Sequence, residues 1–127
     1  MNEIKISKSE QYLHEVQTWR RVLEFFKDEN FFLKTRLATV VDQSTDKNFL
    51  ELAEQFQNRF ITKDVYINEL RNEINSQEKK LKDTNEAATK QKSILNKQTK
   101  LRNEIEFFEK EFNKLKNEFN KCLDTLL

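Results

Sequence analysis

The fold of this chain is decided by residues 101–119, which read LRNEIEFFEKEFNKLKNEF. Apolar side chains recur there at alternating spacings of four and three residues, at Leu101, Ile105, Phe108, Phe112, Leu115 and Phe119. Residues three or four apart share one side of an α-helix, so this spacing places all six on a single stripe. Charged and polar residues fill the remaining positions. The stretch therefore predicts a long amphipathic helix of the kind that packs in coiled coils.

The same spacing runs without a slip through three segments of the chain. The first segment contains Tyr12, Val16, Trp19, Leu23, Phe26, Asn30, Leu33, Leu37 and Val40. The second contains Phe49, Ala53, Phe56, Phe60, Lys63, Ile67, Leu70, Ile74, Gln77 and Leu81. The third contains Ala87, Gln91, Ile94, Gln98, Leu101, Ile105, Phe108, Phe112, Leu115, Phe119, Cys122 and Leu126. Three uninterrupted registers predict three helices.

Composition supports an all-α fold. The 127 residues include no Gly and no Pro, and charged residues make up 35% of the chain. Strand-rich and α/β folds depend on turns that these two residues supply, and phosphate-binding loops need Gly. A chain with neither residue and with helical periodicity is typical of long helices.

Two polar stretches divide the three segments. Residues 42–48 are rich in helix-capping residues, and either Thr45 or Asp46, or Asn48 paired with Glu51, could begin the second helix. Across residues 82–86 the register shifts by three, which fits either a short turn or one continuous helix with a stammer. We predict a flexible N-terminal segment, 1–8, and then helices over 9–41, 46–81 and 84–126.

Short connections make neighbouring helices antiparallel, so the predicted architecture is an up-down-up three-helix bundle with coiled-coil-like packing in one domain, 9–127. In outline, including a Trp in the first helix at Trp19, this resembles a spectrin-type repeat. The resemblance is one of architecture and implies no family membership.

In this topology all eleven phenylalanines gather at the pole of the rod that contains the first turn. Several large apolar residues lie off the predicted core stripes, namely Val22, Phe25, Phe31, Phe32, Ile61, Leu95, Phe107 and Leu123. Among them, Phe25, Phe32, Phe107 and Leu123 are predicted to form a contact surface for another chain. We therefore expect a non-catalytic interaction or scaffold protein whose partner is a second copy, in a homodimer, or another helical protein.

The opposite pole is basic. Residues 79–102 contain Asp83 and Glu86 as their only acidic residues, against Lys79, Lys80, Lys82, Lys90, Lys92, Lys97, Lys100 and Arg102. These eight side chains are candidate anion contacts, and an anion-binding module for nucleic acid or an anionic membrane surface is the alternative function. The segment contains no aromatic residue, which weakens the case for nucleic acid.

Polar residues interrupt the core stripes at Asn30, Lys63, Gln77, Gln91 and Gln98. Buried amides weaken a bundle but fix its register. Gln77 and Gln91 fall at similar heights on neighbouring helices, so they are predicted to pair.

The residue types that carry catalysis are scarce. His14 is the only histidine and falls beside the core stripe, while Cys122, the only cysteine, falls on it. We therefore expect no enzyme activity, no metal, no cofactor and no small-molecule substrate. A single cysteine and the absence of a long apolar run predict a cytoplasmic protein.

Overall fold

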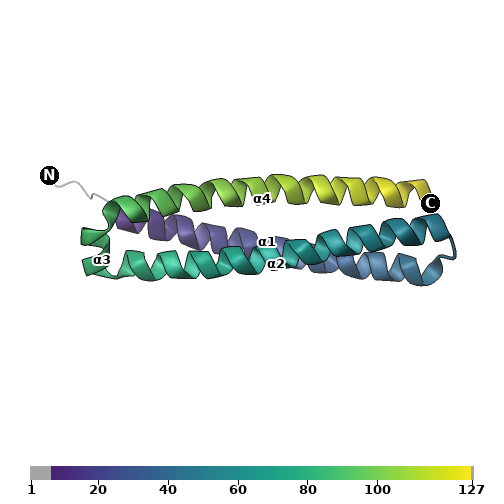
Figure 1. The fold of residues 1–127 in the computed structure, drawn as a ribbon, viewed down its shortest axis with the longest axis horizontal. Coiled ribbons are helices and arrows are strands. Elements are labelled where there is room, and N and C mark those ends of the chain that lie inside the picture. The colour runs from purple at the N-terminus through teal and green to yellow at the C-terminus, as the bar shows by residue number, and fades with distance from the viewer. Residues whose placement is uncertain (1–6, 127) are drawn as a thin grey trace.

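The computed structural model describes residues 7–126, and this range is helical almost throughout (Figure 1). Three helices have 36 residues each: α1 (Lys8–Gln43), α2 (Lys47–Lys82) and α4 (Gln91–Leu126). A fourth helix, α3 (Thr84–Thr89), has six. No strand occurs between residues 7 and 126, so the predicted all-α class is confirmed. Most of the predicted segment 1–8 lies outside the described residues, and Lys8 already belongs to α1.

Side-chain caps begin α1, α2 and α3 in place of glycine turns. The Ser7 hydroxyl accepts a hydrogen bond from the backbone three residues further on, at 3.1 Å. The Asp46 carboxylate caps α2 and the Asp83 carboxylate caps α3, each accepting from the backbone N–H groups two and three residues further on. All three caps have extended backbone angles, and no described residue has a positive φ. Turns of this kind need no Gly.

The predicted count of three helices is wrong, because the described residues form four. α2 ends at Lys82, and the next residue, Asp83, has an extended backbone with φ of −83° and ψ of 108°, so a turn and not a stammer separates α2 from α3. The predicted helix 84–126 is then divided at Lys90, where φ is −121° and ψ is 33°. Residues 84–89 contain no buried side chain. Nothing in the core therefore holds this stretch in line with α4, whose first buried residue is Ile94.

The three long helices lie side by side, as Figure 1 shows. α1 and α4 run in one direction and α2 runs in the other, while α3 spans the end of the rod between α2 and α4. A helix of 36 residues is about 54 Å long at 1.5 Å per residue, so the rod is several times longer than it is wide. α1 and α2 approach each other most closely, and α1 and α4 least closely.

Most of the predicted core positions are buried. One continuous cluster runs along the rod, with Trp19, Leu23 and Phe26 from α1, Phe60 and Leu70 from α2, and matching residues from α4. Lys63 is the charged exception on a core stripe. It is half-buried, and its ammonium lies 5.7 Å from the centre of the buried Phe108 ring, within the range of a cation–π contact. Burial lowers the pKa of Lys63.

The predicted register fails at both ends of the last segment. Gln91 and Leu126 are exposed, and Cys122 is only half-buried. Leu123, predicted to face a partner, is buried with 2% of its surface exposed. A straight helix drifts by about 20° per heptad against a strict seven-residue repeat. By the end of α4 this drift brings Leu123, four positions after Phe119, into the core. The strict repeat would have placed Cys122 there, three positions after Phe119.

The phenylalanines occupy half of the rod, and the prediction of one Phe-rich pole is too narrow. Phe56, Phe60 and Phe119 pack together towards the turn between α1 and α2. Phe26 and Phe108 lie near the midpoints of α1 and α4, and their ring centres are 5.6 Å apart. The aromatic core therefore extends from the turn to the middle of the molecule.

Candidate functional site

Three of the four predicted partner contacts are exposed, and one is not. Phe25, Phe32 and Phe107 expose 58%, 59% and 56% of their surface, whereas Leu123 belongs to the core. Phe31 exposes 67%, the largest fraction among the exposed large apolar side chains. Phe31 was not among the predicted contact residues, although its sequence position already placed it off the core stripe.

Ion pairs show which side of α1 faces which neighbour. Glu15 and Glu29 pair with Arg102 and Lys116 of α4, so their side of α1 faces α4. Arg20 and Lys34 pair with Glu78 and Asp64 of α2, so their side faces α2. These two flanks bracket the core stripe of α1. The surface of α1 opposite the core stripe therefore faces neither neighbour.

Phe25, Phe31 and Phe32 all lie near this outward surface. Phe25 and Phe32 are seven residues apart and lie three or four residues from Glu29, which places both towards the α4 side. Phe31 lies three residues before Lys34, towards the α2 side. We call the exposed residues along this surface the α1 outer face, which consists of Arg21, Glu24, Phe25, Asp28, Phe31, Phe32, Thr35, Ala38, Thr39 and Asp42.

Phe107 lies elsewhere on the rod. It lines an open surface hollow between α2 and α4 together with Tyr66 of α2 and Lys100 and Glu104 of α4. The predicted trio of Phe25, Phe32 and Phe107 is therefore not one surface. The sequence places Phe107 off the core stripe of its helix, but it contains no signal for which side of α4 faces α1 and which faces α2.

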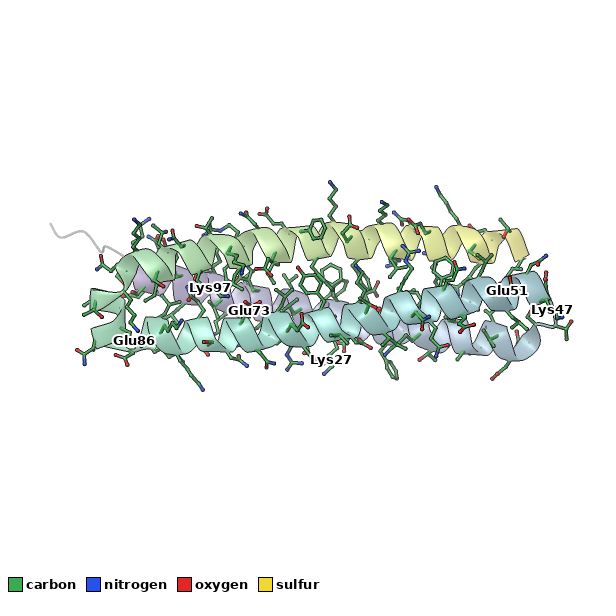
Figure 2. The ribbon with its side chains drawn as sticks, viewed as in Figure 1. Lys27, Lys47, Glu51, Glu73, Glu86 and Lys97 are labelled. Carbon is green, nitrogen blue, oxygen red and sulfur yellow. The ribbon has the colours of Figure 1, made fainter. Side chains whose placement is uncertain are left out.

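The predicted anion-binding surface is largely neutralised by ion pairs. Arg102 bonds the Glu15 carboxylate at 2.6 and 2.8 Å, and Lys97 pairs with Glu73 of α2, towards which it points in Figure 2. Further ion pairs hold Lys82 to Glu78 at 3.5 Å, Lys90 to Glu86 at 3.4 Å and Lys100 to Glu104 at 3.9 Å. Within residues 7–126 only Lys79, Lys80 and Lys92 of the eight candidates have no ion-pair partner. Four of the five pairing carboxylates lie outside residues 79–102. A count of charges within that segment alone therefore overstates the net positive charge of this surface.

The predicted pairing of Gln77 with Gln91 is wrong, and Gln77 pairs with Gln98 instead. The Gln77 amide donates to the Gln98 side-chain oxygen at 3.0 Å and to the Ile94 carbonyl at 2.9 Å. Gln98 in turn donates to the Tyr12 carbonyl and to the Glu15 carboxylate. Both glutamines are buried, at 1% and 0% exposed. This network joins α1, α2 and α4 at one height and fixes their register.

A second polar layer lies in the phenylalanine-rich half. The Asn30 amide donates to the Phe60 carbonyl and to the Asp64 carboxylate, both at 2.8 Å, and Lys34 also pairs with Asp64. Asn30 is fully buried. The layer links α1 to α2 only, so it fixes the register of that pair.

The most strongly perturbed carboxylate is Glu78. The Arg20 guanidinium donates to both of its oxygens, at 2.9 and 2.6 Å, and lowers the pKa of Glu78 from 4.5 to about 2. Because the folded-state pKa lies below the unfolded value, this pair stabilises the fold fully above about pH 4.5. The contribution is lost as the pH falls towards 2.

Arg20→Gln is therefore expected to flatten the acid dependence of stability. The wild type should lose more stability than the variant between about pH 6 and about pH 3, because the variant lacks the Arg20 hydrogen bonds that are the main cause of the low pKa of Glu78. Urea denaturation at the two pH values measures this difference. Lys92→Gln, which removes an unpaired charge, is the control and should retain the wild-type dependence. An Arg20→Gln variant as acid-sensitive as the wild type would contradict the pairing.

The described residues contain no group of three or more His, Cys, Asp or Glu side chains that could hold a metal ion. None of the helices within residues 7–126 is both long and apolar enough to cross a membrane. Compared with protein-family models, with curated proteins and with solved structures, the chain gives no match.

Proposed function

We propose that this chain is a non-catalytic interaction protein, a self-contained up-down-up rod of three long helices with coiled-coil-like packing that associates with a second copy of itself. Three large aromatic side chains on the α1 outer face support the proposal. Phe25, Phe31 and Phe32 expose 58%, 67% and 59% of their surface, while seven other phenylalanines fill the core. Contiguous exposed apolar side chains mark contact surfaces on soluble proteins.

Two properties of the α1 outer face favour a helical partner. It lies along one straight helix, so another helix can pack along it over several turns. Its aromatic residues are spaced six and seven apart, which is close to two helical turns. A reducing compartment such as the cytoplasm suits a chain whose only cysteine, Cys122, is free.

The test removes the three exposed aromatic groups, of which Phe25 also contacts a core ring, that of Phe26, with the two ring centres 5.3 Å apart. Phe25→Gln, Phe31→Gln and Phe32→Gln are combined in one chain, since Gln favours helix and ends in a polar group. Sedimentation equilibrium should then give a mass near 15.4 kDa at every concentration, whereas the wild-type mass rises with concentration. The matched control replaces three comparably exposed apolar residues elsewhere, Ile61, Val65 and Leu95, by Gln.

The control should associate as the wild type does. If both triple variants lose association equally, general surface hydrophobicity and not the α1 outer face drives it. A steep fall in binding to a polyanion with rising salt would instead support the alternative, an anion-binding module at the basic pole.

A further inference from the structure

We propose that two copies of this chain pack through their α1 outer faces in an antiparallel arrangement, with the two-fold axis between Phe31 and Phe32. The inference rests on the proposed self-association and adds its geometry. In such a pair each residue of α1 lies opposite the residue equally far on the other side of the axis. Phe31 and Phe32 of one copy then meet Phe32 and Phe31 of the other at the centre of the contact.

Charge complementarity and the meeting of the exposed aromatic rings together select this register. An axis between Glu24 and Phe25 would also pair Arg21 with Asp28, but it would place Phe31 and Phe32 opposite Thr18 and Gln17. Arg21, Asp28, Thr35 and Asp42 are spaced by seven and form the central line of the α1 outer face. With the axis between Phe31 and Phe32, Arg21 lies opposite Asp42 of the second copy, and Asp28 lies opposite the neutral Thr35. Two-fold symmetry repeats both pairings, so the contact holds two Arg–Asp pairs.

Two further arrangements bring like charges together. In a parallel pair in register, Arg21 lies opposite Arg21 of the second copy, and the same holds for Asp28 and for Asp42. An antiparallel pair centred on Asp28 brings the two Asp28 carboxylates together at the axis. Like charges that face each other across an interface cost several kcal/mol, so both arrangements are disfavoured.

Asp42 provides a second indication. It lies in the last turn of α1, where the helix dipole disfavours an anion, and that turn contains no basic residue. Neither Asp42 nor Arg21 has an ion-pair partner among residues 7–126. A cation from a second copy would offset the unfavourable placement of Asp42, and Arg21 is the cation that this register brings to it.

The contact is large enough for a weak dimer. Residues 20–43 of both copies overlap, which is about 36 Å of helix. Six phenylalanine side chains, each more than half exposed, contribute roughly 700 Å² of buried surface. Stable interfaces bury at least about 1,000 Å², so the remaining residues of the face complete a contact at the lower limit. We therefore expect association that depends on concentration, without a permanent dimer.

Charge reversal tests the register. Arg21→Glu places two carboxylates opposite each other, and Asp42→Arg places two guanidinium groups opposite each other. Each single variant should weaken the dimer by at least about tenfold. The double variant, Arg21→Glu with Asp42→Arg, restores opposite charges and should dimerise within about threefold of the wild type. Asp42→Arg is the sharper single variant, because it should stabilise α1 itself while weakening the dimer.

Lys92→Glu is the control, because Lys92 is exposed, unpaired and on α4, away from the α1 outer face. A double variant that is no better than the single ones, or single variants that behave like the control, would overturn the register while leaving self-association intact. A wild type that stays monomeric at millimolar concentration would overturn the proposed function itself, so the two failures are distinguishable.

Discussion

Phe112→Ala is expected to lower the free energy of unfolding by about 3–5 kcal/mol. The Phe112 ring is fully buried, and its centre lies 4.9 Å from that of Phe26 and 6.0 Å from that of Phe108. Removing the ring leaves a cavity between two long helices that cannot close without shifting the surrounding rings. Because small domains are stable by about 5–15 kcal/mol, a large part of the stability is lost.

A thermal melt monitored by circular dichroism measures the effect, and the midpoint should fall by on the order of 10–20 °C. Phe107→Ala is a control five residues earlier in the same helix. Its ring is 56% exposed, so its removal should change the stability by at most about 0.5 kcal/mol. Equal melting of the Phe112→Ala variant and the wild type would show that α4 does not present this residue to the core.

Gln98→Ala is expected to be the next most destabilising change, at about 2–4 kcal/mol. Gln98 bonds three partners on two other helices, namely Gln77, Glu15 and the Tyr12 carbonyl. Truncation removes all three of these hydrogen bonds and opens a cavity at a fully buried position, and both losses lower the stability.

The double variant Gln77→Leu with Gln98→Leu should behave differently. It replaces both amides at once by apolar groups of similar size, and Glu15 keeps its bonds to Arg102. Removing both partners of a buried polar pair is often neutral or stabilising. Urea denaturation should therefore give a double variant at least as stable as the wild type. A double variant with a lower free energy of unfolding than the Gln98→Ala variant would show that the network stabilises the fold, in addition to fixing its register.

The fold is predictable from the sequence to the extent that heptad spacing governs it. The spacing of Val16, Trp19 and Leu23 predicts their burial in α1, and the Asp46 cap was among the starts that the first polar stretch allows. The division at Lys90 was not predictable in this way. Residues 87–91 continue the spacing, but only the structure shows that α3 buries no side chain.

The candidate surfaces were less predictable, because they depend on which side of each helix faces which neighbour. Exposure of Phe25 and Phe32 agrees with their positions off the core stripe. That Phe107 faces a different groove, and that Glu15 neutralises Arg102, depends on contacts between residues far apart in the chain. A linear count of charge or of apolar residues contains no information of this kind.

The central claim, that the α1 outer face joins two copies, is tested most directly by the mass of the wild-type protein in solution. Light scattering coupled to size exclusion measures this mass from micromolar to millimolar concentration. We predict a value near 15.4 kDa at the lowest concentration that rises towards twice that value at the highest. A mass that stays at 15.4 kDa across the whole range would contradict the claim.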